Sequence, residues 1–309
     1  MTGAPLRAPV LWVTGLGPVR RLVTSTRFGR AVAHRFVAGE ALEDGLAAAR
    51  RLGGHGIGAM LDHLGENVTS PEQASAAADA YVLALKRIAE ADHVDCNIAV
   101  KLTQLGLDLS LDLCLENSER VLAAADPAGT LVMIDMESHE YVDRTLQAVR
   151  ALRKRHPNVG VALQSYLRRT PEDVFLLPPG VPVRLVKGAY LEPPSVALGR
   201  RIEVDRAFAL LFATLVERNH PVHVATHDPR LLAGAVRLVE RRRVPWERIE
   251  LQMLYGIRRD LQRRYADEGY PVRAYIPYGS QWYPYLTRRL AERPANLWFF
   301  ASNLFRRGG

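Results

Sequence analysis

The chain has 309 residues, 48% of them hydrophobic, which is enough to bury the core of one large domain. Its net charge of +8 is compatible with a nucleic-acid or anionic-membrane partner, but the arginines lie in short runs spread along the chain, a pattern more typical of solvated helix faces. Two cysteines, Cys96 and Cys114, make neither a disulfide framework nor a paired-thiol metal site and favour a reducing compartment. No apolar run approaches the ~20 residues that span a bilayer.

The amino-terminal part of the chain is basic. Before Glu40 there are six arginines and no acidic residue, a composition that fits either a mitochondrial transit peptide or a folded arm. Residues 6–50 are expected to form helices outside the repeating units that follow. We therefore predict two parts, an N-terminal helical arm over residues 1–50 and a catalytic barrel over residues 51–309.

From residue 57 onward, short apolar runs alternate with segments of helical periodicity such as 71–90 and 140–156. The runs predicted to be strands are IGAMLD, NIAVKLT, TLVMIDM, VGVALQSY, PVRLVKG, VHVATH, IELQML and VRAYIP. Eight strands, each followed by a helix, favour an α/β protein with a closed, parallel (β/α)₈ barrel of the TIM type over an open sheet.

Two helix starts agree with this phasing. Ser70 is predicted to cap the helix that begins at Pro71, with Gln73 three residues after the cap. Asp228 stands in the same relation to Pro229 before a later helix.

In such a barrel the functional residues lie at the carboxyl ends of the strands. The ends read MIDMES, VKLTQ, ALQSY, RLVKGAY, ATHD and AYIPYG, and nearly all carry charged or hydrogen-bonding groups. Lys101 and Asp135 interrupt apolar strands, where an isolated charge is costly. They form either one internal salt bridge or part of a polar site with Arg184 and the arginines near the carboxyl terminus. An excess of cations there would predict an anionic substrate or cofactor.

Residues 282–290, WYPYLTRRL, have the spacing of a helix. Tyr285, Arg288 and Arg289 would share one face, and two adjacent guanidiniums repel each other unless an anion lies between them. This stretch therefore predicts a site for an anionic ligand.

Two other strand ends suggest contacts with an anion. Lys187 can meet a phosphate, and Gly188 allows close approach of the backbone to a ligand, although a glycine after a strand is often only a turn residue. Thr226 and His227 precede a helix N-terminus, which favours anions, although a lone histidine there is more often a structural hydrogen-bonding residue.

Sequence signatures of other enzyme classes are absent. The sequence has no GxGxxG after the first predicted strand and no P-loop, GxSxG or HExxH motif, and its histidines lack metal-ligand spacing. We expect no metal site.

Several stretches, in order, resemble the proline dehydrogenase family in its short bacterial monofunctional form: VKLTQLGL, MIDMES, ALQSYL, RLVKGAY, ATHD, QMLYGI, AYIPYG and YPYLTRRLAERPAN. The resemblance covers about residues 35–305 and also includes FVAGEALEDGLAA and MLDHLGENV. It implies a distorted (β/α)₈ barrel that holds non-covalent FAD, with the last helix over the barrel mouth. The reaction it implies is oxidation of L-proline to 1-pyrroline-5-carboxylate by hydride transfer to flavin N5, with electrons passed on to a quinone.

The resemblance also assigns roles on the substrate side. Arg288 and Arg289 resemble the pair that binds the proline carboxylate, which a planar guanidinium matches geometrically. Asp135 resembles the catalytic carboxylate that orders the basic residues. The remaining expected residues are Lys101 at the substrate, Tyr275, Tyr285 and Leu254 as walls around the proline ring, and Glu292 orienting the two arginines.

On the cofactor side, Arg184 resembles the arginine near flavin N5, where positive charge stabilises the reduced ring. The other residues expected to contact FAD are Met136, Gln164, Lys187, Gly188, Ala189, Thr226 and His227. The loop after Lys101 departs from the lysine motif of the bifunctional members of the family, which affects gating more than chemistry.

The expected location is cytoplasmic, and the basic charge leaves open a peripheral contact with the inner face of an anionic membrane; no nucleic-acid partner is expected. One alternative is another flavin-dependent barrel of the methylenetetrahydrofolate reductase type, although such proteins would lack the terminal YxxRR pattern. A basic module that binds nucleic acid or membrane is the alternative from a different class.

Overall fold

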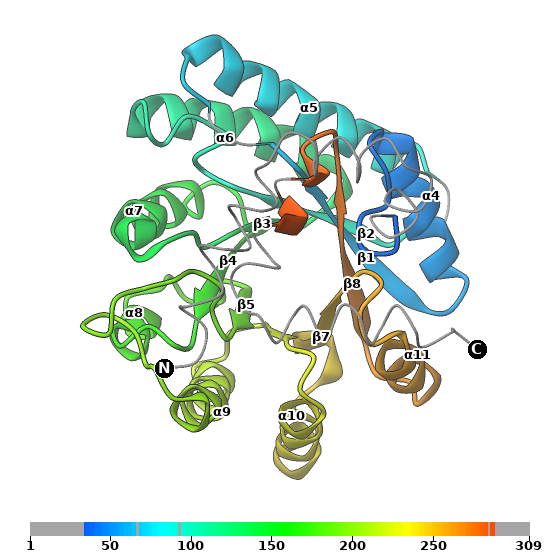
Figure 1. The fold of residues 1–309 in the computed structure, drawn as a ribbon, viewed down its shortest axis with the longest axis vertical. Coiled ribbons are helices and arrows are strands. Elements are labelled where there is room, and N and C mark those ends of the chain that lie inside the picture. The colour runs from blue at the N-terminus through cyan, green and yellow to red at the C-terminus, as the bar shows by residue number, and fades with distance from the viewer. Residues whose placement is uncertain (1–33, 66–67, 92–93, 284, 288–309) are drawn as a thin grey trace.

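The computed structural model describes residues 34–65, 68–91, 94–283 and 285–287. Within them eight parallel strands pair in chain order, and β1 pairs with β8 to close a barrel (Figure 1). The strands are β1 (Ile57–His63), β2 (Cys96–Val100), β3 (Val132–Ile134), β4 (Val159–Gln164), β5 (Val183–Val186), β6 (Val222–Ala225), β7 (Ile249–Leu254) and β8 (Val272–Tyr278). All eight predicted strands, and the barrel itself, are confirmed.

Helices surround the barrel on its outer side (Figure 1). They are α4 (Leu42–Gly53), α5 (Pro71–Ala89), α6 (Leu111–Ala125), α7 (Val142–Leu152), α8 (Thr170–Phe175), α9 (Arg201–Glu217), α10 (Pro229–Arg242) and α11 (Arg259–Asp267). Short 3₁₀ turns are η1 (Asp126–Ala128), η2 (His139–Tyr141) and η3 (Trp246–Arg248). The predicted caps are confirmed, because the Ser70 side chain accepts a hydrogen bond from the Gln73 N–H and the Asp228 side chain accepts one from the Arg230 N–H.

Alternation along each strand divides the side chains between two cores. Leu61, Ile98 and Ile134 belong to the large core between the strands and the helices. Met60 and Met133 belong to a small apolar cluster, and the contact of Met60 with the Arg184 side chain places this cluster inside the barrel. Side chains two residues apart on a strand share a face, so the residues after this cluster on each strand are directed to the barrel mouth.

Helix α4 occupies the place of a barrel helix although it precedes β1 in the chain. It packs against both β1 and β8, and Gly45 allows this approach, because a Cβ there would lie 3.0 Å from the Leu61 side chain. The predicted boundary at residue 50 falls inside α4. The described end of the predicted arm is therefore part of the helical layer, and the division into two domains stays a prediction.

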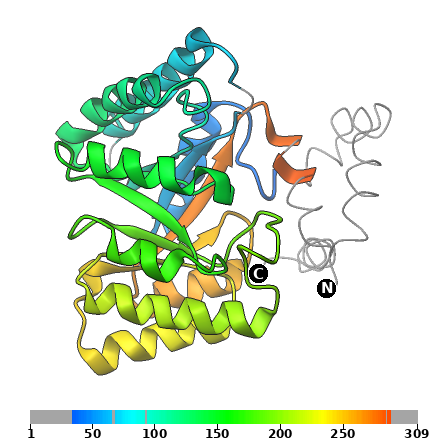
Figure 2. The same ribbon diagram turned by 90° about the vertical axis from the view of Figure 1, so that its left-hand side faces the viewer.

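The described residues after β8, 279–283 and 285–287, lie at one end of the barrel (Figure 2). A helix begins at Trp282, whose indole N–H donates to Glu40 at 2.9 Å. Tyr285 packs with Val37 and Leu64 in a cluster separate from the barrel interior. The rest of the predicted last helix, with Arg288, Arg289 and Glu292, lies outside the described residues.

None of the described helices is long and apolar enough to cross a membrane. The residues before 34, on which the transit-peptide hypothesis depends, lie outside the described part of the chain.

The contact between the segment before α4 and the loop after β7 can be tested with two glycines of positive φ. A Cβ on Gly256 (φ +75°) would lie 1.7 Å from the Arg35 carbonyl oxygen, whereas one on Gly269 (φ +85°) would meet no atom within 4 Å. We expect Gly269→Ala to lower the free energy of unfolding by about 1–2 kcal/mol through backbone strain alone, and Gly256→Ala to lower it further. Urea unfolding measures both, and equal losses would contradict the close packing of this segment.

Candidate active site

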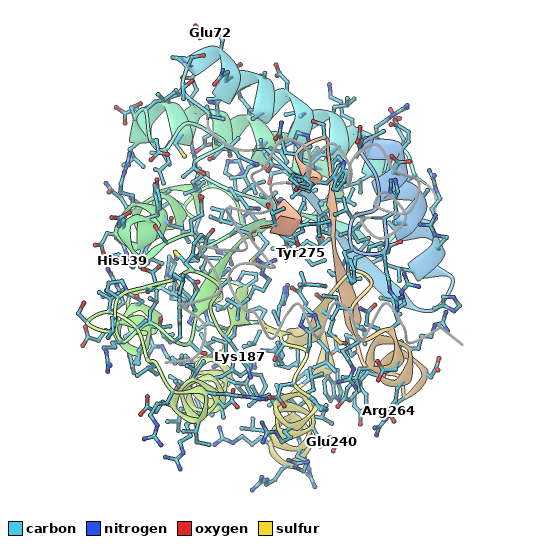
Figure 3. All side chains as sticks on the ribbon, in the orientation of Figure 1. Glu72, His139, Lys187, Glu240, Arg264 and Tyr275 are labelled. Carbon is cyan, nitrogen blue, oxygen red and sulfur yellow. The ribbon has the colours of Figure 1, made fainter. Side chains whose placement is uncertain are left out.

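The carboxylate of Asp135 is the centre of a buried cluster at the carboxyl ends of the strands. Arg184 from β5 donates to it at 2.6 Å, and the Tyr275 hydroxyl from β8 donates at 2.8 Å. The Lys101 ammonium, just after β2, lies 3.2 Å away. The Arg184 guanidinium also lies over the Tyr275 ring, 4.6 Å from its centroid. Figure 3 places Tyr275 near the middle of the barrel.

A second carboxylate, Asp62, completes this cluster. It is 1% exposed and accepts a hydrogen bond from the Lys101 ammonium at 2.8 Å, which is closer than Asp135. The cluster therefore pairs two cations, Lys101 and Arg184, with two anions. The expected excess of cations is not present among the described residues and depends on Arg288 and Arg289.

Burial and pairing together set the charges of the cluster. Burial raises the pKa of the Asp135 carboxyl, but Arg184 and Lys101 outweigh it and hold that pKa below its ordinary value. Burial lowers the pKa of the Lys101 ammonium, but Asp62, with Tyr275 and Asp135, raises it well above the ordinary value. Lys101 is therefore a fixed cation and hydrogen-bond donor rather than a base.

Apolar side chains pack beside the cluster inside the barrel. Leu254 of β7 packs with Tyr275, Met60 and Met133. One layer deeper, Arg273 pairs with Glu250 at 2.8 Å.

A second polar group lies at the ends of β5 and β6, and Figure 3 shows its Lys187 near α9. The Lys187 ammonium contacts Asp205 at 2.5 Å and Asp228 at 3.3 Å. Thr226 accepts a hydrogen bond from the Asp228 N–H through its hydroxyl, and the His227 Nε2 accepts one from the Leu254 N–H at 2.9 Å. Lys187 is thus shared by Asp205, which the sequence did not single out, and by Asp228, which it predicted only as a helix cap.

Gly188 follows Lys187 with φ of +119°, and a Cβ there would lie 2.2 Å from the ring of Tyr166. The close approach that requires glycine is thus to a side chain of the same protein. The neighbouring Ala189 is half-buried. Met136 is buried in the core between strands and helices, and the Gln164 amide donates to the Glu137 carbonyl oxygen at 2.8 Å. Their predicted contacts with FAD stay predictions.

The structure brings together Lys101, Asp135, Arg184, Tyr275 and Leu254, as the sequence predicted for one site. Tyr285 lies in a different cluster. Asp62 was not among the predicted site residues. It is a charged residue at the end of the apolar run IGAMLD, which is the same kind of pattern that identified Asp135. The described residues include no group of three or more metal-ligating side chains suited to a metal ion.

A closed (β/α)₈ barrel with a buried ion cluster at the carboxyl ends of its strands defines the class of TIM-barrel enzymes. Comparison with known proteins narrows this class. Residues 45–302 match the proline dehydrogenase family. The chain belongs to this family.

Curated relatives agree in length as well as in sequence. A proline dehydrogenase of Deinococcus radiodurans is 40% identical over 281 residues, which are 89% of this chain and 90% of that protein. Proline dehydrogenase 1 of Bacillus subtilis (strain 168) is 36% identical over 290 residues, 92% of this chain and 96% of that protein.

Among solved structures, proline utilization A from Bdellovibrio bacteriovorus, inactivated by N-propargylglycine, superimposes with a TM-score of 0.78 at 26% identity. It is matched over 85% of this chain, and this chain spans 32% of its length. Proline utilization A from Bradyrhizobium japonicum has a TM-score of 0.73 at 22% identity over 94% of this chain and 34% of its own, a likeness of fold.

The depressed pKa of Asp135 predicts a pH-dependent contribution to stability. Its ionised form stabilises the fold above the unfolded pKa of about 3.9, and this contribution is lost as the pH falls through the lower folded pKa. We expect the difference in unfolding free energy between wild type and Asp135→Asn to be constant from pH 7 to about 5 and to shrink below about 4. Denaturant unfolding at several pH values measures it, with Asp112→Asn, exposed on α6, as the control. A difference that does not change with pH would contradict the assigned pairing.

Proposed function

We propose that the chain catalyses the FAD-dependent oxidation of L-proline to 1-pyrroline-5-carboxylate, the first step of proline catabolism to glutamate. Family membership supports the substrate, and the ion cluster of Asp135, Lys101 and Arg184 is the observation that carries the proposal for the site. A substrate that carries both a carboxylate and an amine suits a mouth in which both signs of charge are held in place.

The residues present fit a flavin. The Arg184 Nε is buried and has no hydrogen-bond partner among the described residues, whereas its two terminal nitrogens are engaged. A spare buried donor suits an acceptor-rich ring system. Lys187, Thr226 and the N-terminus of α10 would face the diphosphate side, with Met136, Gln164, Gly188, Ala189 and His227 as the further residues proposed to hold FAD.

When bound, FAD would supply the oxidant, accepting a hydride from the proline ring. The protein then has three tasks: to hold the substrate carboxylate, to exclude water and to fix positive charge beside the cofactor. We assign the first to Arg288 and Arg289 with Lys101, the second to Tyr275, Tyr285 and Leu254, and the third to Arg184. Asp135 keeps Lys101, Arg184 and Tyr275 in one arrangement.

For the electron acceptor we propose a quinone, which rests on the resemblance described above. A lipid-soluble acceptor and a net charge of +8 together favour a cytoplasmic enzyme that contacts an anionic membrane peripherally. The folate-type flavin barrel is not favoured, because the family match is to proline dehydrogenase.

The test of the proposed function is an anaerobic visible spectrum of the purified protein. We expect a bound flavin whose absorbance is bleached by L-proline and not by D-proline or a reduced folate. A protein without flavin, or a flavin that L-proline leaves oxidised, would contradict the proposal.

The role proposed for Arg289 predicts a specific loss of affinity. Replacing Arg289 by Met should leave the flavin spectrum intact and weaken substrate binding by roughly 2–5 kcal/mol, because the carboxylate would lose one partner. The measurement is inhibition by tetrahydrofuroic acid, a ring acid that resembles proline and cannot be oxidised in its place. A pairing of both arginines with Glu292 on the helix surface predicts a change below ~1 kcal/mol instead. Equal inhibition constants for wild type and Arg289→Met would show that Arg289 does not bind the substrate carboxylate.

A further inference from the structure

The side chain of Glu137 contacts Thr103, and neither residue belongs to the groups proposed to bind substrate or cofactor. It lies two residues after Asp135, and its carboxylate accepts from the Thr103 hydroxyl at 2.8 Å and 3.0 Å. The Thr103 N–H lies 3.3 Å from the same carboxylate. All three contacts join the segment after β3 to the loop after β2.

Thr103 is two residues from Lys101, so the contact acts on the loop that begins at the cationic residue. The first turn of this loop is closed by a hydrogen bond from the Gln104 N–H to the Lys101 carbonyl oxygen at 3.1 Å. Because the turn is short and bonded within itself, the position of Thr103 constrains the backbone of Lys101.

The opposite side of this turn is held by Gln104. Its amide donates to the His63 carbonyl oxygen at 3.2 Å and to the Gly65 carbonyl oxygen, both at the end of β1. The Lys101 ammonium is likewise bonded on both sides, to Asp62 of β1 and to Asp135 after β3. The loop is therefore bonded to the same two neighbouring strand ends as the ammonium it carries.

The pKa of the Glu137 carboxyl shows that the contact with Thr103 is important for its charge. Burial raises the pKa of its carboxyl, while the hydrogen bonds from Thr103 favour the ionised form. The Glu137 carboxylate is half-buried, and among the described residues all its hydrogen bonds come from Thr103. Its ionised form is therefore stabilised mainly by this one threonine.

We propose that Glu137 is a positioning residue that, through Thr103, fixes the Lys101 ammonium at the height where it meets the substrate. The Gln164 amide, which donates to the Glu137 carbonyl oxygen at 2.8 Å, steadies the backbone from which Glu137 acts. The inference rests on the proposed function, because its readout is substrate binding.

Two matched substitutions on the Thr103 side provide the test. Thr103→Val keeps the shape of the side chain but removes the hydroxyl donor, and Thr103→Ser restores it. We expect Thr103→Val to raise both the KM for L-proline and the inhibition constant of tetrahydrofuroic acid about tenfold with little change in kcat, since a lost binding contact raises KM alone. Thr103→Ser should recover most of the loss.

Glu137→Ala should produce at least the same rise, because it also removes the contact of the Thr103 N–H. The double variant Glu137→Ala with Thr103→Val should be no worse than Glu137→Ala alone, since the hydroxyl then has no carboxylate to bind. If Glu137→Ala does not fold, the Thr103 pair decides alone. All measurements use protein loaded with FAD, checked by its visible spectrum.

Three results would overturn the inference: a lowered melting temperature with unchanged KM and inhibition constant, loss of FAD instead of loss of substrate affinity, or additive effects in the double variant. A wild type that L-proline does not reduce would instead refute the proposed function, so the two failures are distinguishable.

Discussion

A carboxylate buried in the barrel mouth must be neutralised, and this requirement on Asp135 organises the rest of the site. Its three donors come from the residue after β2 and from β5 and β8, so the compensating side chains lie in different parts of the barrel wall. Removing one partner of a buried ion pair typically costs about 3–5 kcal/mol. Lys101, Arg184 and Tyr275 are therefore held in one arrangement before any ligand arrives, which is how a site avoids reorganisation during reaction.

The charged cluster and the residues proposed for the cofactor lie on different sets of strands. The charged cluster takes its members from the ends of β1, β2 and β3 and from β5 and β8. The residues proposed for the cofactor lie in or just after β3, β4, β5 and β6. Arg184 of β5 belongs to both, since it binds Asp135 and retains a spare donor. A change at Asp135 would therefore reach the cofactor and the substrate together.

The sequence predicted the barrel because eight apolar runs and the helical segments between them repeat with regular phase, and local patterns of this kind survive tertiary packing. It predicted Lys101 and Asp135 as site residues because a charge inside an apolar strand is costly unless it is paired or binds a ligand. Asp62 gives the same signal and was overlooked. The sharing of Lys187 between Asp205 and Asp228, and the place of α4 beside β8, could not be predicted, since each depends on segments distant in sequence that meet only in the fold. The roles of Arg288 and Arg289 rest on helical spacing and resemblance alone.

On the proposed function, the Asp135 carboxylate holds Lys101, Arg184 and Tyr275 in place for the reaction. The most direct test is the rate at which L-proline reduces the bound flavin in Asp135→Ala, followed anaerobically by stopped flow, with Asp112→Ala on the exposed face of α6 as the control. We predict a variant that folds and retains FAD but whose flavin is reduced at least about a hundredfold more slowly, the loss expected when a preorganised electrostatic group is removed. A variant that retains FAD and is reduced at the wild-type rate would rule out this role for Asp135.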